Sequence, residues 1–149
     1  MRYYSYPEFL RDMKLLVAKM ADFRPDAIVA VARGGLTIAQ MLCEYYDIRQ
    51  FYAINSTLYD GVKRLDSVHL ANIPTIDNAK DVLVVDEIVD SGKSLATVIE
   101  ALSSAHPWIN FKSAALFQKS TASFCADYYL HDPGDVWVEF FWEVDLLRD

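Results

Sequence analysis

A short apolar run followed by two acids and a glycine turn constrains this chain more than any other feature. The run from Val82 to Val85 is four consecutive apolar residues, which is typical of a strand buried on both faces of a parallel sheet. Asp86 and Glu87 follow where such a strand would end, and Ser94 opens an amphipathic run with helical spacing. Because open α/β sheets bind ligands beyond the carboxyl ends of their strands, we predict a binding site here.

The residues of the turn indicate what that site would bind. A helix N-terminus attracts anions, Ser91 and Ser94 add hydroxyl donors, Lys93 adds positive charge, and Gly92 lets the backbone approach closely. The two acids would repel a bare phosphate, whereas sugar hydroxyls and Mg²⁺ are natural partners of carboxylates. We therefore predict a phosphorylated sugar with a metal ion. A Walker phosphate loop is excluded because Glu87 stands where its first glycine would be.

The stretch 82–94 resembles the phosphoribosyl-pyrophosphate (PRPP) motif of the type I phosphoribosyltransferases. That motif consists of apolar residues, two acids, two apolar residues, an acid, Ser or Thr, Gly, any residue, and Ser or Thr, and each class is present. The resemblance implies that PRPP is a substrate and Mg²⁺ a cofactor. It implies that Asp86 and Glu87 hold the ribose hydroxyls, directly or through the metal, and that residues 91–94 fix the 5′-phosphate. The alternative is an ordinary buried strand followed by a capped helix.

A second strand, turn and helix repeat this plan earlier in the chain. Residues 27–32 read as a buried strand, Arg33-Gly34-Gly35 as a tight turn, and Leu36 begins a helical pattern. Two glycines after an arginine suit a loop whose N–H groups surround an anion, although a simple strand-to-helix turn is the alternative. The resemblance implies that Arg33 and the Gly34 amide hold pyrophosphate. In the family this turn often carries a non-proline cis peptide, here at Ala32–Arg33.

The segment 55–76 is long, polar and poorly periodic. Such an insertion in a compact domain predicts a functional lid, and the alternative is a solvated hairpin. The resemblance places here a loop that closes over the reacting ribose and whose basic tip residue reaches pyrophosphate. Arg64 is the first candidate for that residue and Lys63 the second.

The C-terminal third resembles the base-binding hood of the purine branch of the family. There a lysine reaches the exocyclic oxygen of a 6-oxopurine, an aromatic residue stacks on the base, and adjacent backbone reads the base edge. These roles fall on Lys119, Trp137 and Val138, while Trp142-Glu143 resembles the Trp–acid pair of the xanthine-guanine type. Trp137 as a core aromatic and Lys119 as a surface lysine are the alternatives. Ser120 departs from that type, which often has proline there.

Composition and the remaining elements indicate the fold class. The chain has 149 residues, 53% of them apolar, which is enough for one full core, so we predict a single domain over residues 1–149. Ser5 and Glu8 have capping-box spacing, and further strands are predicted at 51–54, 111–117, 128–130 and 136–140. Together these patterns and the resemblance predict an α/β fold, with a mostly parallel central sheet flanked by helices and a small hood built from the two ends of the chain.

Charge and cysteine content restrict partners and compartment. The net charge of −7 argues against nonspecific nucleic-acid binding. We expect no signal peptide and no membrane span, and we expect Cys43 and Cys125 to be reduced core residues. These features predict a cytoplasmic protein, and its aromatic content and apolar helices suit a homodimer or homotetramer.

The resemblance implies purine salvage. The chain would transfer the 5-phosphoribosyl group from PRPP to guanine, xanthine or hypoxanthine, giving the nucleoside 5′-monophosphate and pyrophosphate. Asp90 lies beside the phosphate turn, where it could accept the purine imidazole proton as a general base or simply cap the turn. Two alternatives stay open, a PRPP-dependent transferase for another base and a nucleotide-sensing regulator on the same fold.

Overall fold

The computed structural model describes residues 1–59 and 67–149 as eight strands, four α-helices and one 3₁₀ helix. In chain order these are β1 (Arg2–Tyr4), α1 (Tyr6–Met20), β2 (Ala27–Ala32), α2 (Leu36–Tyr46), β3 (Phe51–Tyr59), β4 (Ser67–Ala71), β5 (Asp81–Val89), α3 (Lys93–Ala105), β6 (Asn110–Gln118), β7 (Tyr128–His131), β8 (Val138–Phe140), α4 (Phe141–Val144) and η1 (Asp145–Leu147). No described helix is long and apolar enough to span a membrane.

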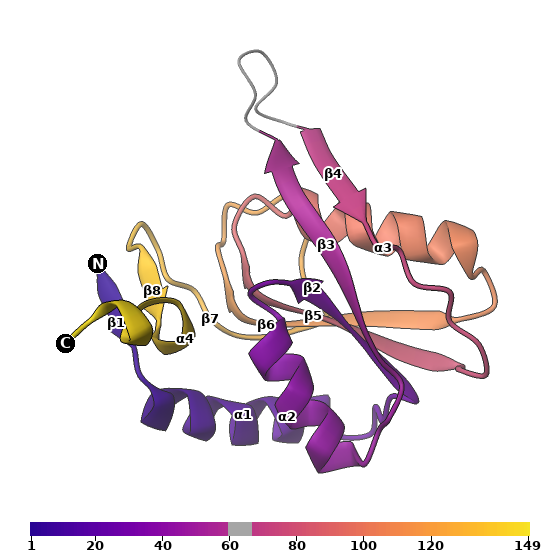
Figure 1. Cartoon of the computed structure of the whole chain (residues 1–149), viewed down its shortest axis with the longest axis horizontal. Helices are drawn as coiled ribbons and strands as arrows, with labels where there is room; N and C mark the ends of the chain where they lie inside the picture. The colour runs from indigo at the N-terminus through magenta and orange to yellow at the C-terminus, as the bar shows by residue number, and fades with distance from the viewer. Residues whose placement is uncertain (60–66) are drawn as a thin grey trace.

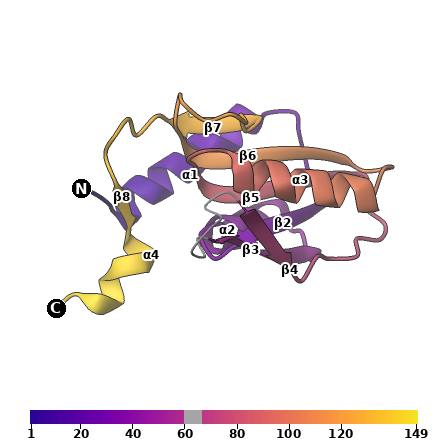
Figure 2. The same cartoon turned by 90° about the horizontal axis from the view of Figure 1, so that it is seen from above.

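The described strands form one central sheet and one small ribbon. The sheet has six strands in the order β4-β3-β2-β5-β6-β7, parallel throughout except that β4 runs antiparallel to β3. Figures 1 and 2 show α1 and α2 on one face of it and α3 on the other. This confirms the predicted α/β fold with a mostly parallel sheet flanked by helices.

Successive side chains of the central strands point to opposite faces of the sheet, which divides the core into two halves. The residues from Val82 to Val85 are all fully buried. Leu83 and Val85 pack in the cluster that includes α1 and α2, while Val82 and Val84 pack in the cluster that includes α3. A strand covered on both faces needs apolar residues at every position, which is why this run is continuous rather than alternating.

The predicted helix signals are confirmed. The Ser5 hydroxyl accepts from the Glu8 N–H, and the Glu8 carboxylate accepts from the Ser5 N–H at 2.9 Å, so the capping box begins α1. α2 begins at Leu36 as expected, and α3 ends at the cap residue His106. α3 begins at Lys93, one residue before the predicted Ser94.

Three local predictions need correction. The predicted strand end at Val85 is wrong, because β5 keeps pairing with β6 as far as Val89, so the two acids that follow Val85 lie within the strand. The 51–54 strand extends to Tyr59. Cys125 is exposed rather than buried, because the next residue, Ala126, takes the inward position and its N–H donates to Gln118 at 2.7 Å.

The flanks of the 55–76 insertion form an antiparallel hairpin. β3 and β4 pair from Asn55 with Ala71 to Tyr59 with Ser67, which agrees with the hairpin alternative for those flanks. Arg64 and Lys63, the predicted pyrophosphate contacts, lie outside the described residues.

The two ends of the chain build the predicted hood. β1 pairs in parallel with β8, from Arg2 with Val138 to Tyr4 with Phe140. The ribbon and α4 lie beside the sheet near both termini (Figures 1 and 2). The 136–140 strand is shorter than expected, since β8 begins at Val138.

Candidate active site

The ends of β2, β3 and β5 surround one cavity of about 650 Å³. Its walls come from the turn after β2, from β3, from β5 and the turn that follows it, from the start of α3, and from α4. The lining residues are Val31, Ala32, Arg33, Gly34, Ser56, Leu58, Asp86, Glu87, Ile88, Val89, Asp90, Ser91, Gly92, Ser94, Leu95, Trp142 and Glu143. Eight of the residues predicted for the site, those at 33, 34, 86, 87, 90, 91, 92 and 94, are therefore brought together.

The Glu87 carboxylate lies directly against the glycine turn after β2. A Cβ atom added to Gly34 would sit 0.8 Å from Glu87 Oε2, and one added to Gly35 would sit 2.2 Å from the Val85 carbonyl oxygen. Real Cβ atoms do not approach other atoms so closely. The two glycines therefore let the turn pack onto β5, so that Arg33 and the acids line the same cavity.

Of the two neighbouring acids near the end of β5, Asp86 is buried and Glu87 is half-buried. Asp86 is 8% exposed, and its Oδ1 accepts from the Glu87 N–H at 2.9 Å. Burial raises the pKa of the Asp86 carboxyl, and burial together with the nearby charges of Asp86 and Glu143 raises the pKa of Glu87. A buried carboxylate without a cation partner destabilises the folded chain, and a ligand that supplies positive charge or hydroxyl donors relieves this cost.

The donor set fits Mg²⁺. Mg²⁺ prefers carboxylate oxygens and usually takes only one or two of them together with oxygens of the substrate and water. Asp86 and Glu87 offer that pair at the cavity wall. Within the described residues no three His, Cys, Asp or Glu side chains are grouped to hold a metal by themselves.

The segment that follows β6 contacts the turn after β5 and holds it in place. Gly92 has a φ of +91°, and a Cβ there would lie 2.7 Å from the Phe124 nitrogen. The Ser91 carbonyl accepts from both the N–H and the hydroxyl of Ser123, at 2.8 and 3.0 Å. The Lys93 N–H donates to the Ser91 hydroxyl at 3.2 Å. The turn is thereby fixed with the N-terminus of α3 at the cavity.

The turn after β2 has the backbone that the family resemblance implied. The Ala32–Arg33 peptide bond is cis. The Gly35 N–H donates to the Val31 carbonyl at 2.9 Å, and the Leu36 N–H donates to the Arg33 carbonyl at 3.0 Å. Arg33 is exposed and lines the cavity.

Lys119 lies next to this site without lining it. Its Nζ is 2.9 Å from Asp90 Oδ1, and the side chains of Lys119 and Asp90 are 29% and 64% exposed. The predicted proton acceptor and the predicted base-reading lysine are therefore in contact.

Three other predicted residues also stand outside the cavity lining. Trp137 is 69% exposed, which excludes the alternative of a core aromatic, whereas the Val138 side chain is buried in the hood. Lys93 lies in the phosphate turn but does not line the cavity.

The lining residues that come from β3 and α4 carried no predicted role, namely Ser56, Leu58, Trp142 and Glu143. The Ser56 hydroxyl and the Trp142 ring N–H are buried without a hydrogen-bond partner. The Trp–acid pair was visible as a family resemblance, and the place of Glu143 in this cavity could have been assigned from it. Ser56 lay in the poorly periodic insertion, where no sequence pattern marks which face a residue occupies.

The raised pKa of Glu87 predicts that Glu87→Gln stabilises the ligand-free chain. This gain in stability is absent below pH 4.5, the ordinary pKa of a glutamate, because Glu87 is then protonated in both the folded and unfolded states. It grows as the pH rises above 4.5 towards the raised pKa, and melting curves at pH 8 should show a Tm higher by several degrees, about 2–4 °C for each kcal/mol. Glu100→Gln, an exposed glutamate on α3, is the control and should show no such pH-dependent gain. If Glu87→Gln and the unchanged chain had the same Tm at pH 8, the raised pKa assigned to Glu87 would be wrong.

Comparisons with known proteins agree with this geometry. The family model described as "Phosphoribosyl transferase domain" matches residues 3–148. The chain is 26% identical over 150 residues to the xanthine-guanine phosphoribosyltransferase of Cereibacter sphaeroides, covering 95% of this chain and 86% of that protein.

Two solved structures extend the similarity to three dimensions. The Helicobacter pylori xanthine-guanine-hypoxanthine phosphoribosyltransferase matches with a TM-score of 0.91 and 45% identity over 98% of this chain and 96% of that one. A purine phosphoribosyltransferase from Pyrococcus horikoshii matches with a TM-score of 0.79 and 28% identity over 95% and 93% of the two chains. The predicted resemblance is confirmed, and the chain belongs to the phosphoribosyltransferase family.

Proposed function

We propose that this chain transfers the 5-phosphoribosyl group of PRPP to a 6-oxopurine, with guanine, xanthine or hypoxanthine as acceptor, in purine salvage. One observation carries the proposal. A single cavity joins two buried acids, a glycine turn at a helix N-terminus, and an arginine–glycine turn, which suit the hydroxyls, the phosphate and the pyrophosphate of one ligand. The similar proteins from C. sphaeroides, H. pylori and P. horikoshii bear names of the same activity.

PRPP occupies the cavity in this proposal. Asp86 and Glu87 hold its ribose hydroxyls, and the turn from Ser91 through Gly92 and Lys93 to Ser94 holds its 5′-phosphate with N–H groups, hydroxyls and charge. Arg33 and the Gly34 amide hold the pyrophosphate, joined by Arg64 from the insertion.

Asp86 and Glu87 are also the proposed ligands of Mg²⁺. When bound, the ion supplies positive charge to the departing pyrophosphate. The buried carboxylates fix where that charge sits, and their own repulsion is relieved by it.

The purine lies between the cavity and the hood. Lys119 reaches its exocyclic oxygen, Trp137 stacks on its ring, and the Val138 backbone reads its edge. Displacement at the anomeric carbon passes through a cationic ribose, so positioning and charge provide most of the rate. Asp90 takes the proton that the imidazole nitrogen loses as the new bond forms. The 2.9 Å contact with Lys119 keeps Asp90 close to the base.

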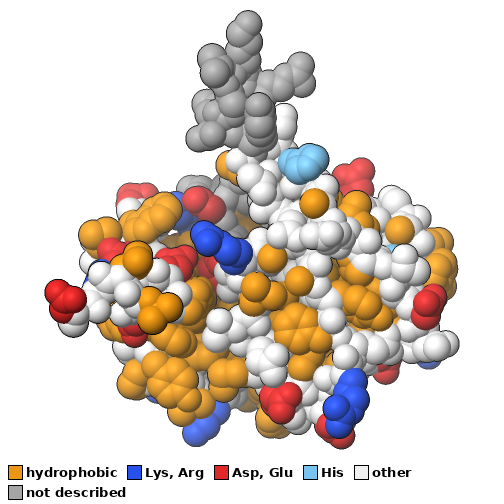
Figure 3. All heavy atoms as spheres, viewed as in Figure 1, with side chains coloured by type: hydrophobic (Ala, Val, Ile, Leu, Met, Phe, Trp, Pro, Cys, Tyr) orange, Lys and Arg blue, Asp and Glu red, His pale blue; other side chains and the backbone are white. Residues whose placement is uncertain are grey.

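Compartment, domain count and assembly follow as parts of this proposal. We propose a single cytoplasmic domain over residues 1–149 that binds no nucleic acid, in keeping with the net charge of −7. Tyr6, Leu15 and Tyr45 on α1 and α2 remain exposed, and hydrophobic surface covers the lower left of the face in Figure 3. Such exposed apolar side chains support a homodimer or homotetramer.

A base panel tests the function. With PRPP and Mg²⁺, pyrophosphate release is expected with guanine, xanthine or hypoxanthine and not with adenine, uracil or orotate. Turnover confined to adenine or a pyrimidine would make the chain a transferase for another base. Nucleotide binding without turnover on any base would make it a regulator.

Asp90→Asn should lower kcat by about 10²-fold while the KM for PRPP changes little, because the amide cannot accept the proton. Steady-state kinetics with the preferred base measures both constants. Asp22→Asn, at an exposed aspartate just after α1, is the control. An unchanged kcat in Asp90→Asn would remove Asp90 from the chemistry.

Trp137→Ala should raise the KM for the purine by about tenfold and leave the KM for PRPP near its original value, because stacking contributes about 1–3 kcal/mol for each base. Trp108→Ala is a matched control, since Trp108 is 63% exposed and Trp137 is 69% exposed. A purine KM that is the same in both variants would reject Trp137 as the stacking surface.

A further inference from the structure

The segment 132–137 carries Trp137 and is anchored at both of its ends. It leaves β7 after His131 and enters β8 at Val138. Most of its residues are exposed. Its position therefore depends on what holds the last residue of β7 and the first residue of β8.

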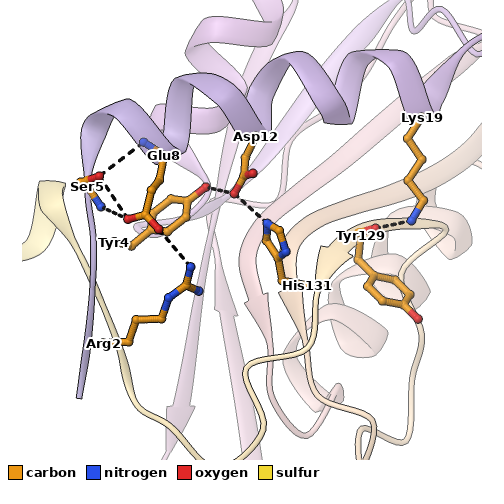
Figure 4. Close-up of polar contacts among 8 residues, drawn as sticks. All are labelled: Arg2, Tyr4, Ser5, Glu8, Asp12, Lys19, Tyr129 and His131. Atoms are coloured by element: carbon orange, nitrogen blue, oxygen red, sulfur yellow. Dashed lines mark hydrogen bonds and ion pairs between the residues drawn. The ribbon is translucent and has the colours of Figure 1, made fainter.

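A buried carboxylate on α1 holds the first end. Asp12 is 5% exposed, and its Oδ2 lies 2.9 Å from His131 Nε2. The same oxygen accepts from the Tyr4 hydroxyl at 2.5 Å. Figure 4 shows the three side chains converging from β1, α1 and β7. Lys19 of α1 adds a second attachment by donating to the Tyr129 carbonyl, also in β7.

β1 holds the second end. The Arg2 N–H donates to the Trp137 carbonyl at 2.8 Å, and β1 then pairs with β8 from Arg2 with Val138 onward. Tyr4 fixes β1 in turn. Its ring is fully buried and packs edge-on against Phe117 of β6 and Phe140 of β8, at centroid distances of 5.3 and 5.4 Å.

The buried Asp12 carboxylate has to keep both of its hydrogen bonds. A buried carboxylate is tolerated only with its hydrogen bonds made, and bonds to a charged acceptor are about twice as strong as neutral ones. Burial and the bond to Asp12 raise the pKa of the Tyr4 hydroxyl, so it stays a donor throughout the physiological range. Loss of Asp12 would leave the buried Tyr4 hydroxyl without its acceptor and remove the side-chain link between β1, α1 and β7. The backbone pairing of β1 with β8 and of β7 with β6 would remain, so both ends of the segment would be held more loosely.

We propose that Tyr4, Asp12 and His131 form a positioning network that holds the segment 132–137 and thereby sets how strongly the chain binds its purine. The proposal rests on the proposed function, in which Trp137 and Val138 form the base-binding surface. The three residues are far along the chain from the PRPP turns and line no part of the PRPP cavity. Loss of the network should therefore weaken purine binding more than PRPP binding, because a ligand's apparent affinity falls with the fraction of molecules in the competent arrangement.

The experiment compares Asp12→Ala and Asp12→Asn with the unchanged chain in steady-state kinetics. Asp12→Ala should raise the KM for the purine by about tenfold and change the KM for PRPP by less than about twofold. Asp12→Asn should recover most of the loss, because its amide oxygen can still accept from Tyr4 and His131. Tyr4→Phe keeps the packed ring and loses only the hydroxyl, so it provides the same test if Asp12→Ala does not fold.

His106→Ala is the matched control. His106 is 4% exposed and its Nε2 accepts from the Ile76 N–H at 3.0 Å, so the variant also breaks a buried polar contact, but one beyond the far end of α3. It should lower the Tm without separating the two KM values. A purine KM in Asp12→Ala that is unchanged, or that rises together with the KM for PRPP, would overturn the proposal.

Hydrogen–deuterium exchange without any ligand separates this proposal from the proposed function. Amides in residues 132–140 should exchange faster in Asp12→Ala than in the unchanged chain, and should not change in His106→Ala. Unaltered exchange in Asp12→Ala would overturn the network. If the unchanged chain turned over no base while Asp12→Ala sped this exchange, the proposed function would fail and the network would stand as a fastening of the hood.

Discussion

The contact between Glu87 and Gly34 is the constraint on which the candidate site depends. Parallel pairing of β2 with β5 brings the ends of both strands to one edge of the sheet, and the missing side chain at Gly34 lets a carboxylate lie against the neighbouring turn. Any side chain there would push the Glu87 carboxylate away. An arginine, two acids and a helix N-terminus thus share one cavity because a glycine stands at one position.

That arrangement carries an electrostatic cost in the ligand-free chain. Asp86 and Glu87 are neighbours in a strand, the first buried and the second half-buried, and Glu143 adds a further negative charge to the same cavity. Burial and repulsion favour their protonated forms, whereas a cation and sugar hydroxyls favour the charged forms. Burial of these acids lowers the stability of the folded chain, and a bound ligand that neutralises them restores that free energy. The site therefore favours a ligand that carries both hydroxyls and associated positive charge.

Sequence reasoning predicted the mostly parallel sheet and the two turns that bound the cavity, for a definite reason. The run 82–85 and the strand 27–32 are continuous apolar stretches followed by glycine turns, and the period and the turn chemistry agree. The true end of β5 could not be predicted, because Asp86 and Glu87 are polar, yet β5 keeps pairing with β6 through Asp86, Ile88 and Val89. The roles of Ser56 and of the Tyr4–Asp12–His131 contact were equally hidden, since these depend on elements that meet only in the folded chain.

The two substrates of the proposed reaction are held by parts of the molecule with different origins. The PRPP cavity is built at the edge of a sheet whose strands are covered on both faces, so its geometry comes from the core itself. The hood is a two-stranded ribbon, too small to be stable alone, and it depends on aromatic packing and on one buried carboxylate for its place. A change confined to the segment 132–137 can therefore alter the proposed acceptor contacts, whereas a shift of α4 would also move Trp142 and Glu143 at the cavity wall. The core, by contrast, fixes Lys119, which follows β6 directly and donates its N–H to the Val89 carbonyl at 3.0 Å. One proposed base contact therefore stays tied to the turn after β5, while the proposed stacking surface can vary.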